Sequence, residues 1–164
     1  MEYRLPLERV ADIALLFLDG DCLESVLIDR LGHTDYDFGK FNCLKRALAQ
    51  IEKIEESLGL AAILWQAYPT NDRVGAPLVA GSSLPLEGCK RQFLPPEIRA
   101  AIRDGARSVS ERGGGIVSLY CPVRNSQHEI VGALELLAGL SEKIDVGVRD
   151  MFVNREPLEQ EEDL

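Results

Sequence analysis

Apolar and polar residues follow two different periods along the chain, and the change of period separates predicted helices from predicted strands. Over residues 38–58 the apolar positions recur every three or four residues, as in an amphipathic helix. They form one stripe: Phe41, Leu44, Leu48, Ile51, Ile54 and Leu58. Gly59 follows, in a position where helices commonly end. We predict that this stripe packs on the sheet of its own domain; the alternative is pairing with a second copy, although fewer than three heptads are present.

Other helical patterns flank this segment. Residues 6–31 have a helical period that Asp19-Gly20-Asp21 interrupts, which predicts two short helices. We expect Val10, Ile13, Ala14 and Phe17 on the buried face of the first. Pro95-Pro96-Glu97 suits a helix start, and the pattern predicts a helix over 96–111 that the glycines at 113–115 stop. A last helix is predicted over 141–152, before a disordered acidic tail.

The strand patterns are apolar runs bounded by turn residues. Residues 60–68 predict a buried strand, followed by a loop at 69–77 and a second strand at 78–82. Residues 83–96 are expected to be irregular because they contain three prolines. Residues 116–123 and 130–137 predict a hairpin joined by the polar segment 125–128. These elements predict an α+β fold, with an antiparallel sheet of about five strands backed by helices.

The expected organisation is one domain of 164 residues. It consists of a helical N-terminal extension over 1–37, the main domain over 38–152 and the acidic tail over 153–164. The net charge of −9 argues against nucleic-acid binding, which needs a clustered positive surface. The apolar run at 13–18 is too short to cross a bilayer, and no basic segment precedes it as in a signal peptide. We therefore expect a cytoplasmic protein without a membrane partner.

The cysteines are spread without a CxxC pair, and with two histidines they give no zinc-ligand spacing. They are Cys22, Cys43, Cys89 and Cys121. We predict four buried, reduced thiols. Cys121 and His128 could form a thiol nucleophile and its base, but no orienting third group is evident and His128 falls in the predicted turn. The expectation is therefore that the chain is not an enzyme.

The predicted hairpin carries the motifs of a known family. Residues 118–124, SLYCPVR, look like the "vPv" strand of GAF domains, and residues 129–136, EIVGALEL, look like their "g.vvGvlel" strand. Residues 51–68 and 77–83 resemble the entry helix with first strand and the second strand of the same family. The resemblance covers roughly residues 40–152 and extends to PAS-like and Cache-like relatives, all small-molecule sensor domains of bacterial signalling proteins.

The resemblance leaves two matters open. The single helix predicted before the "vPv" strand looks more like a PAS-like or Cache-like arrangement, whereas the absence of membrane segments favours a cytoplasmic GAF-like domain. No chromophore-attachment cysteine or cyclic-nucleotide signature can be matched, so the ligand and any cofactor stay unknown. The resemblance implies a module that binds a small molecule or relays a signal. From the strand motifs and the long helix we further expect a homodimer through the N-terminal helices, which signals through a separate output protein.

A sensor of this kind would hold its ligand between one sheet face and the segment around 83–111. Aromatic walls and forked arginines would bind a small molecule there. The candidate ligand-binding residues are Trp65, Tyr68, Arg91, Arg99, Arg103, Tyr120 and Arg124. For Trp65 the alternative is a plain core residue. The basic residues between 90 and 112 could bind an anion or an acidic partner, or could form a solvated helix face.

Two other functions stay open. A dimerisation or scaffold module could keep the fold without binding a ligand, since a fold does not determine a function. A thiol enzyme is the more remote alternative. A pocket lined by polar groups would favour the sensor, whereas a collapsed apolar core with an exposed stripe over 41–58 would favour the scaffold.

Overall fold

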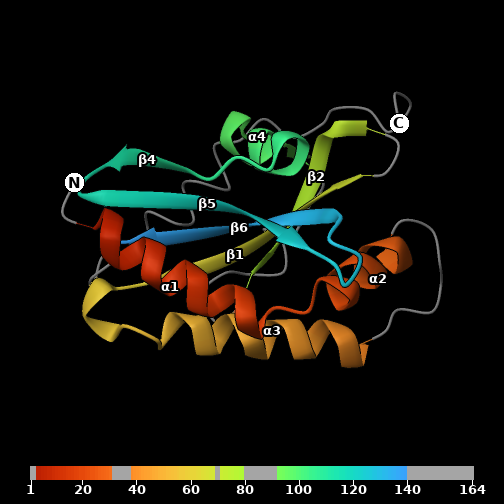
Figure 1. Ribbon diagram of the computed structural model, residues 1–164, viewed down its shortest axis with the longest axis horizontal. Coiled ribbons are helices and arrows are strands. Elements are labelled where there is room, and N and C mark those ends of the chain that lie inside the picture. The colour runs from red at the N-terminus through yellow and green to blue at the C-terminus, as the bar shows by residue number, and fades with distance from the viewer. Residues whose placement is uncertain (1–2, 31–37, 69–70, 80–91, 140–164) are drawn as a thin grey trace.

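A six-stranded antiparallel sheet with strand order β3-β2-β1-β6-β5-β4 forms the centre of the molecule (Figure 1). The computed structural model describes residues 3–30, 38–68, 71–79 and 92–139. The strands are β1 Ala61–Tyr68, β2 Asn71–Val79, β3 Gln92–Phe93, β4 Ser108–Gly113, β5 Ile116–Arg124 and β6 Ile130–Ala138. The helices are α1 Arg4–Phe17, α2 Gly20–Arg30, α3 Phe38–Glu52 and α4 Pro96–Asp104. The α+β class with an antiparallel sheet is therefore confirmed.

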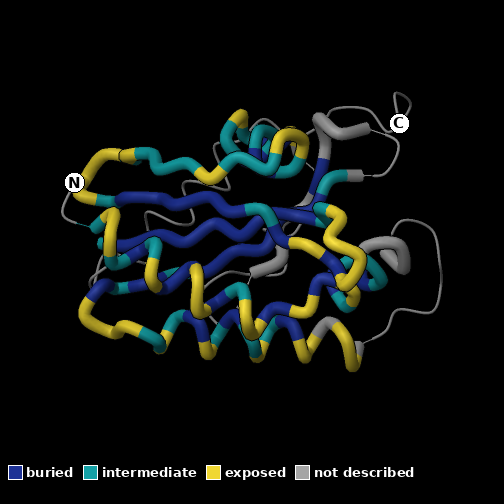
Figure 2. The backbone as a smooth tube through the Cα atoms, in the orientation of Figure 1, coloured by how far each residue is buried: buried dark blue, intermediate teal, exposed yellow. Residues whose placement is uncertain are grey.

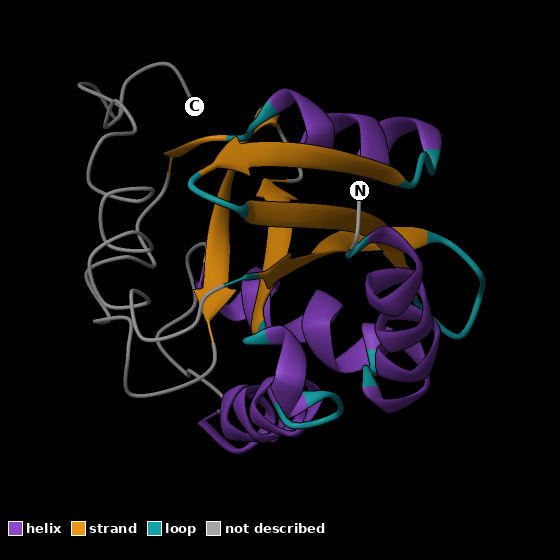
Figure 3. Cartoon of the chain, turned by 90° about the vertical axis from the view of Figure 1, so that its left-hand side faces the viewer, coloured by secondary structure: helices purple, strands orange, loops and turns teal. Residues whose placement is uncertain are grey.

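Helices cover both faces of this sheet. Helices α1, α2 and α3 lie on one face and α4 lies on the other, as the view along the sheet shows (Figure 3). Strands β1, β5 and β6 are buried along almost their whole length between these layers (Figure 2). Side chains alternate between the faces along each strand, so the sheet serves two separate cores. We call them the α1 face and the α4 face.

The α1 face is an apolar core. Leu64, Leu119 and Leu136 come from the three central strands and are at most 1% exposed. Helix α1 places Leu7, Val10, Ala11 and Ala14 against the same core. The predicted break between two short N-terminal helices is confirmed, but Ile13 and Phe17 are exposed and not buried. The buried face of α1 centres on the line along the helix that joins Leu7 and Ala14. Ile13 and Phe17 lie to one side of this line and therefore reach solvent.

The apolar stripe of α3 packs on the sheet of its own domain, as predicted. Leu44, Leu48 and Ile51 are at most 2% exposed and belong to the α1-face core. The helix ends at Glu52, earlier than the predicted residue 58, and a separate 3-10 turn spans Glu56–Leu58. Gly59 ends that turn with a left-handed φ of 56°. The helical period thus continues through two different local structures, which periodicity alone does not separate.

The segment predicted as one helix over 96–111 is a helix followed by a strand. Helix α4 ends at Asp104, and Gly105 adopts a left-handed φ of 66° and donates its N–H to Ala101. Residues 108–113 then form β4, which pairs with β5. The prediction was wrong because it continued the helix through Gly105, although a glycine commonly ends a helix in this left-handed conformation. Strand β4 and the two-residue β3 bring the sheet to six strands, one more than expected.

Strand β2 also differs from its prediction. It spans Asn71–Val79, whereas residues 71–77 were expected to be a loop because of their proline, glycine and asparagine content. Gly75 pairs with Ala67, at a point where an added Cβ would lie 2.1 Å from the carbonyl oxygen of Gln66. A glycine that permits close backbone approach was therefore interpreted as a loop signal. The predicted helix at 141–152 and the acidic tail lie outside the described residues.

The turn between β5 and β6 is fixed to the start of α2. Asn125 is 8% exposed, and its Oδ1 accepts the backbone N–H groups of Gln127 and Glu129 at 3.0 and 2.9 Å. Asp21, in the first turn of α2, accepts the backbone N–H and the hydroxyl of Ser126, both at 3.1 Å. The hairpin that carries the family motifs is thus tied to the N-terminal helices as well as to its own sheet.

Candidate functional site

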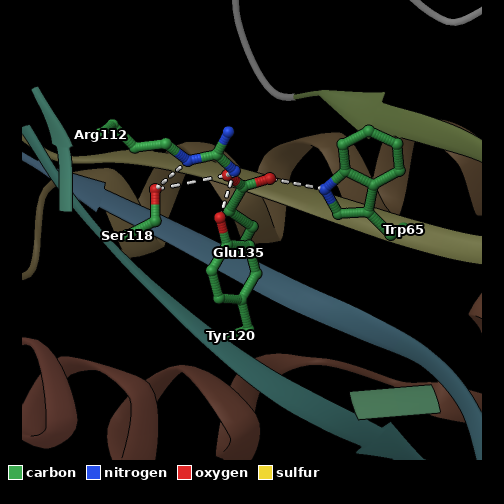
Figure 4. A network of polar contacts seen from close by, with 5 residues as sticks. All are labelled: Trp65, Arg112, Ser118, Tyr120 and Glu135. Carbon is green, nitrogen blue, oxygen red and sulfur yellow. Dashed lines mark hydrogen bonds and ion pairs between the residues drawn. The ribbon is translucent and has the colours of Figure 1, made fainter. Parts of the chain in front are cut away.

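The α4 face carries a buried group of polar side chains around Glu135 (Figure 4). Glu135 lies in the middle of β6 and is 0% exposed. Its Oε2 accepts the indole N–H of Trp65 at 2.7 Å, and its Oε1 accepts an N–H of Arg112 at 2.7 Å and the hydroxyl of Ser118 at 3.4 Å. Each carboxylate oxygen therefore has a donor. This satisfies a charge that would otherwise be very costly to bury.

The register of the sheet brings these residues together. Tyr120 on β5 lies directly opposite Glu135, and Ile63 on β1 lies opposite it on the other side. Trp65 is two residues beyond Ile63 and therefore points to the same face. Arg112 comes from the edge strand β4, where the pairing with β5 shifts between Glu111 and Gly113. That irregularity lets the Arg112 side chain reach across β5 to the carboxylate on β6.

Arg112 connects the members of the group. Its Nε donates to the Ser118 hydroxyl at 3.3 Å, and its Nη2 donates to both Glu135 and the Tyr120 hydroxyl. Its guanidinium also lies over the Tyr120 ring, 5.6 Å from the centroid, within the range of a cation–π contact. The Arg112 side chain is 23% exposed while Glu135 is 0% exposed. Arg112 is thus the member of the group that links the buried carboxylate to solvent.

Burial shapes the chemistry of Tyr120. Burial, with a smaller contribution from the nearby Glu135 carboxylate, raises the pKa of the phenol to about 12. The hydroxyl therefore stays protonated near neutral pH. The group as a whole offers one carboxylate, one guanidinium, two hydroxyls and two aromatic rings on one sheet face. Such a set can orient a polar or aromatic small molecule by hydrogen bonds and stacking.

The structure brings together two of the seven predicted ligand-binding residues. Trp65 and Tyr120 share the α4 face, and both are 0% exposed. Arg99 and Arg103 lie on α4, the first half-buried and the second exposed. Arg124 is exposed at the end of β5, where it donates to the carbonyl of His128 at 2.8 Å. Arg91 and the side chain of Tyr68 lie outside the described residues.

The basic segment does not form one continuous face. Arg107 lies beyond the end of α4 and forms an ion pair with Asp12 of α1 at 2.9 Å. Arg112 lies on β4 and forms an ion pair with Glu135 on the α4 face. Of the basic segment, Arg99 and Arg103 therefore lie on α4, and Arg107 and Arg112 lie beyond it. The expected solvated helix face is limited to α4 itself.

The predicted site missed Glu135, Arg112 and Ser118. The sequence carries one signal for them: Glu135 is the only charged residue in the apolar run from Ile130 to Ala138. A lone carboxylate in a strand buried on both faces needs a buried partner. Arg112 could not be paired with it from the sequence, because the predicted helix over 96–111 leaves no strand β4 to bring residue 112 beside β5.

A second feature is an open hollow of about 350 Å³ beside the end of α1. It is lined by Leu15, Leu18, Gly105, Arg107, Pro122, Val123 and Arg124. Both arginines at this hollow already have partners, Asp12 for Arg107 and a turn carbonyl for Arg124. The hollow contains one of the predicted site residues, Arg124, and none of the Glu135 group.

The thiol-enzyme alternative finds no support in the geometry. Cys121 is 0% exposed in the α1-face core, and burial raises the pKa of its thiol to about 11. His128 lies in the exposed turn after β5, with a left-handed φ of 66°. A protonated, enclosed thiol is a poor nucleophile. The prediction of buried thiols holds for Cys121, but Cys22 is half-buried and Cys43 is exposed.

The described residues contain neither a metal-binding cluster nor a helix that could span a membrane. In these parts of the chain, no group of three or more His, Cys, Asp or Glu side chains is arranged to hold a metal ion. None of the helices from α1 to α4 combines the length and the apolar character needed to span a bilayer.

Comparison with known proteins gives a likeness to a solved structure. No family model matches the chain, and no curated protein matches it. Among solved structures, the chain is similar to the crystal structure of the A. Aeolicus nlh2 GAF domain in an inactive state. That match covers 87% of this chain and 90% of the other, with a TM-score of 0.45 and 10% sequence identity.

Proposed function

We propose that this chain is a cytoplasmic signalling domain of GAF-like type, which binds a small molecule on the α4 face of its sheet and relays the signal to a separate partner protein. The sequence motifs of β5 and β6 and the antiparallel sheet with helices on both faces support the GAF-like assignment. The cysteines in the described residues are free thiols, which suits a reducing compartment such as the cytoplasm.

One observation carries the binding proposal, and it is the difference between the two sheet faces. The α1 face is filled by aliphatic side chains such as Leu64, Leu119 and Leu136. The same three strands present Trp65, Tyr120 and Glu135 to the α4 face. A buried ion pair commonly gives no more stability than apolar residues of similar size. Stability alone therefore does not account for the Glu135–Arg112 pair, which supports a binding role for this group.

The polar group also suggests how binding could be transmitted. A ligand that competes for Arg112 or Glu135 would change the hydrogen bonds that join β4, β5, β6 and β1. Helix α4 packs over this face through Ile98 and Ala101, so its position depends on what lies beneath it. Binding would favour one packing of α4 over another, and a partner protein would recognise that difference.

Native mass spectrometry of the purified chain tests this proposal. We expect gentle conditions to retain a co-purifying small molecule and denaturing conditions to release it. Arg112→Lys keeps the positive charge but loses the planar fork, and we expect it to reduce the bound fraction at least about tenfold. Arg46→Lys on exposed α3 is the matched control and should not change the bound fraction. Bound molecule that is unaffected by Arg112→Lys would place the site elsewhere.

A scaffold without a ligand is the second candidate, and one observation favours it. Trp65 and Tyr120 are both 0% exposed, so the described part of the α4 face is closely packed. If the chain is bare in native spectra, and no compound of a metabolite library raises its melting temperature, the scaffold function replaces the sensor. The exposed stripe expected of a scaffold on α3 is not found, because Leu44, Leu48 and Ile51 are buried.

A further inference from the structure

The hollow beside the end of α1 lies where strand β5 extends beyond its neighbour β4. The pairing of the two strands begins with Ser108 opposite Tyr120, while β5 continues to Arg124. Among the described residues, no strand therefore pairs with this end of β5 on the β4 side. Helix α1 packs on β5 from one face of the sheet and α4 packs on it from the other (Figure 3). The hollow of about 350 Å³ is lined by the end of α1, the segment after α4 and this unpaired end of β5.

One part of the lining is apolar. It consists of Leu15 and Leu18 near the end of α1 and of Pro122 and Val123 on β5. Leu18 and Val123 belong to the α1-face core, so the core reaches the surface at this point. A ligand with an apolar body would cover these side chains and remove them from water, which is favourable. The volume also lies within the range of ~300–1,000 Å³ that is usual for small-molecule sites.

The other part of the lining is basic. Arg107 donates through Nη1 to Asp12 at 2.9 Å, and Arg124 donates through Nη1 to the carbonyl of His128 at 2.8 Å. Within the described parts of the chain, these bonds use only one nitrogen of each guanidinium. An arginine carries N–H groups on three nitrogens, so Nε and Nη2 of both side chains can donate to a ligand.

Arg124 is held in place although it is exposed. Besides its bond to the carbonyl of His128, its Nη2 lies close to Gly105, where an added Cβ would be 3.1 Å away. A side chain at residue 105 would therefore crowd the guanidinium, and glycine leaves room for it at the edge of the hollow. A side chain that is already positioned loses less conformational entropy when a ligand binds.

The charges at the hollow favour an anion with a single charge. Two guanidinium groups and the Asp12 carboxylate bound to one of them leave one net positive charge. Glu8, one turn before Asp12 on α1, is paired with Arg4 at 3.3 Å. The side chains of Arg107 and Asp12 are 35% and 68% exposed, and an ion pair so open to solvent contributes little to stability. Arg107 can therefore share its donors with a ligand at little cost.

We propose that this hollow is a second binding site, which takes a small organic carboxylate with an apolar body. The carboxylate accepts N–H groups of Arg107 and Arg124, and the body covers the apolar wall. The proposal goes beyond the function proposed for the α4 face and does not depend on it, because the hollow contains no member of the Glu135 group.

Nuclear magnetic resonance spectra of the ¹⁵N-labelled chain test the site with three probes. Hexanoate has both a carboxylate and an apolar chain, acetate lacks the chain, and 1-hexanol lacks the charge. The amide signal of Gly105 reports on the hollow, and the indole signal of Trp65, the single tryptophan, reports on the α4 face. We expect hexanoate to shift the Gly105 signal with a dissociation constant on the order of 1 mM, and to leave the Trp65 signal in place. Acetate and 1-hexanol should bind at least about tenfold more weakly, because each lacks one of the two contacts.

Substitutions at the charged residues test the recognition of the carboxylate. Arg107→Gln and Arg124→Gln should each weaken hexanoate binding at least about fivefold. Asp12→Asn should strengthen it about threefold, because the variant lacks the carboxylate that competes for Arg107. Arg46→Gln removes the same charge from an exposed position on α3, so it is the matched control and should leave the affinity unchanged. The dispersion of each spectrum shows whether the variant is folded, and a loss of folding could not produce the gain expected of Asp12→Asn.

Four results would overturn the proposal: a Gly105 signal that hexanoate does not shift well above the expected dissociation constant, 1-hexanol that binds as tightly as hexanoate, an affinity that neither arginine substitution lowers, or weaker binding by Asp12→Asn. A hexanoate shift confined to the Trp65 signal would also overturn it, while supporting a site on the α4 face. The failure of one site is thus distinguished from the failure of the other.

Discussion

Trp65 and Glu135 lie on neighbouring strands, and the indole N–H donates to the carboxylate at 2.7 Å in the interior of the α4 face. The hydrogen bond joins residues that are 70 positions apart in the chain. With Arg112 on the other oxygen, it links β1, β6 and β4 through one carboxylate. The polar group is therefore a structural bridge across the sheet as well as the proposed binding site.

Glu135→Leu should strongly destabilise the fold. The substitution leaves the Arg112 guanidinium and the Trp65 indole without their acceptor, and breaking a buried ion pair in this way costs about 3–5 kcal/mol. Part of the Arg112 side chain is exposed, so we expect a loss of about 2–3 kcal/mol in the free energy of unfolding. Urea unfolding followed by tryptophan fluorescence measures it directly, because the single tryptophan is Trp65.

The double variant Arg112→Met, Glu135→Leu distinguishes the stability that comes from the ion pair from the stability that comes from the other contacts of Arg112. Suppose that Arg112 and Glu135 stabilise the fold mainly through their contact with each other. The double variant should then regain most of the stability lost in Glu135→Leu, since apolar replacements of both partners are often neutral. Glu111→Leu, on the exposed side of β4, controls for the loss of a carboxylate. A double variant no more stable than Glu135→Leu would show that Arg112 stabilises the sheet through Tyr120 and Ser118 instead.

The sequence predicted the packing of α3 and the central strands well because their apolar periods are long. Apolar residues repeat at helical spacing over several turns of α3, and apolar runs extend along both strands of the β5–β6 hairpin. Tertiary packing buries the residues that these patterns mark. Errors arose at glycines. Gly105 ends a helix and Gly75 sits within a strand, and the same residue type has opposite effects on local structure at the two positions.

The site was predicted only in part, for a related reason. Trp65 and Tyr120 were found because large aromatic residues on buried strands must lie in a core. The Glu135–Arg112 pair depends on the register of three strands and on an irregularity at residue 112, and neither follows from local patterns. Arg124 is predicted as a ligand-binding residue and Arg107 as part of the basic segment, yet Arg124 donates to the carbonyl of His128 and Arg107 donates to Asp12. Long-range partners of charged residues are set by the fold.

Glu52 should make the stability of the fold depend on pH. Burial raises the pKa of its carboxyl from 4.5 to about 6, while a hydrogen bond from the backbone N–H of Ala62 acts in the opposite direction. The folded state therefore binds the proton more tightly than the unfolded state. Its favourable contribution is complete below pH 4.5 and is lost as the pH rises through about 6.

Glu52→Gln removes this dependence while it keeps an oxygen to accept the Ala62 N–H. We expect the variant to gain about 1 kcal/mol over the wild type between about pH 4 and about pH 8, a value reduced for the partial exposure of the side chain. Urea unfolding across that range measures the gain. Glu55→Gln, at an exposed position three residues further on, is the control. A Glu52→Gln variant whose advantage shrinks as the pH rises would contradict the sign of the shift.

Asn125→Ala should loosen the β5–β6 turn from helix α2. The side chain accepts two backbone N–H groups and donates to Glu24 and Glu129 at 3.3 and 3.1 Å. Its loss leaves those N–H groups without a protein acceptor, so we expect a cost of about 1–3 kcal/mol. Gln127→Ala, an exposed neighbour in the same turn, should cost less than about 0.5 kcal/mol. Equal effects of the two substitutions in thermal unfolding would show that the turn gains little from Asn125.

Labelling of the thiols should report whether α1 opens from the sheet. Cys121 is buried beneath α1 with a thiol pKa of about 11, so about one thiol in ten thousand is ionised at neutral pH. Cys43 is exposed on α3. With iodoacetamide and peptide mass spectrometry, we expect Cys43 to react within minutes and Cys121 to react only when denaturant unfolds the chain. Leu7→Ala in α1 should accelerate the labelling of Cys121 by opening a cavity in the core that the two residues share. If Cys121 reacts as fast as Cys43 in the native chain, α1 detaches readily from the sheet.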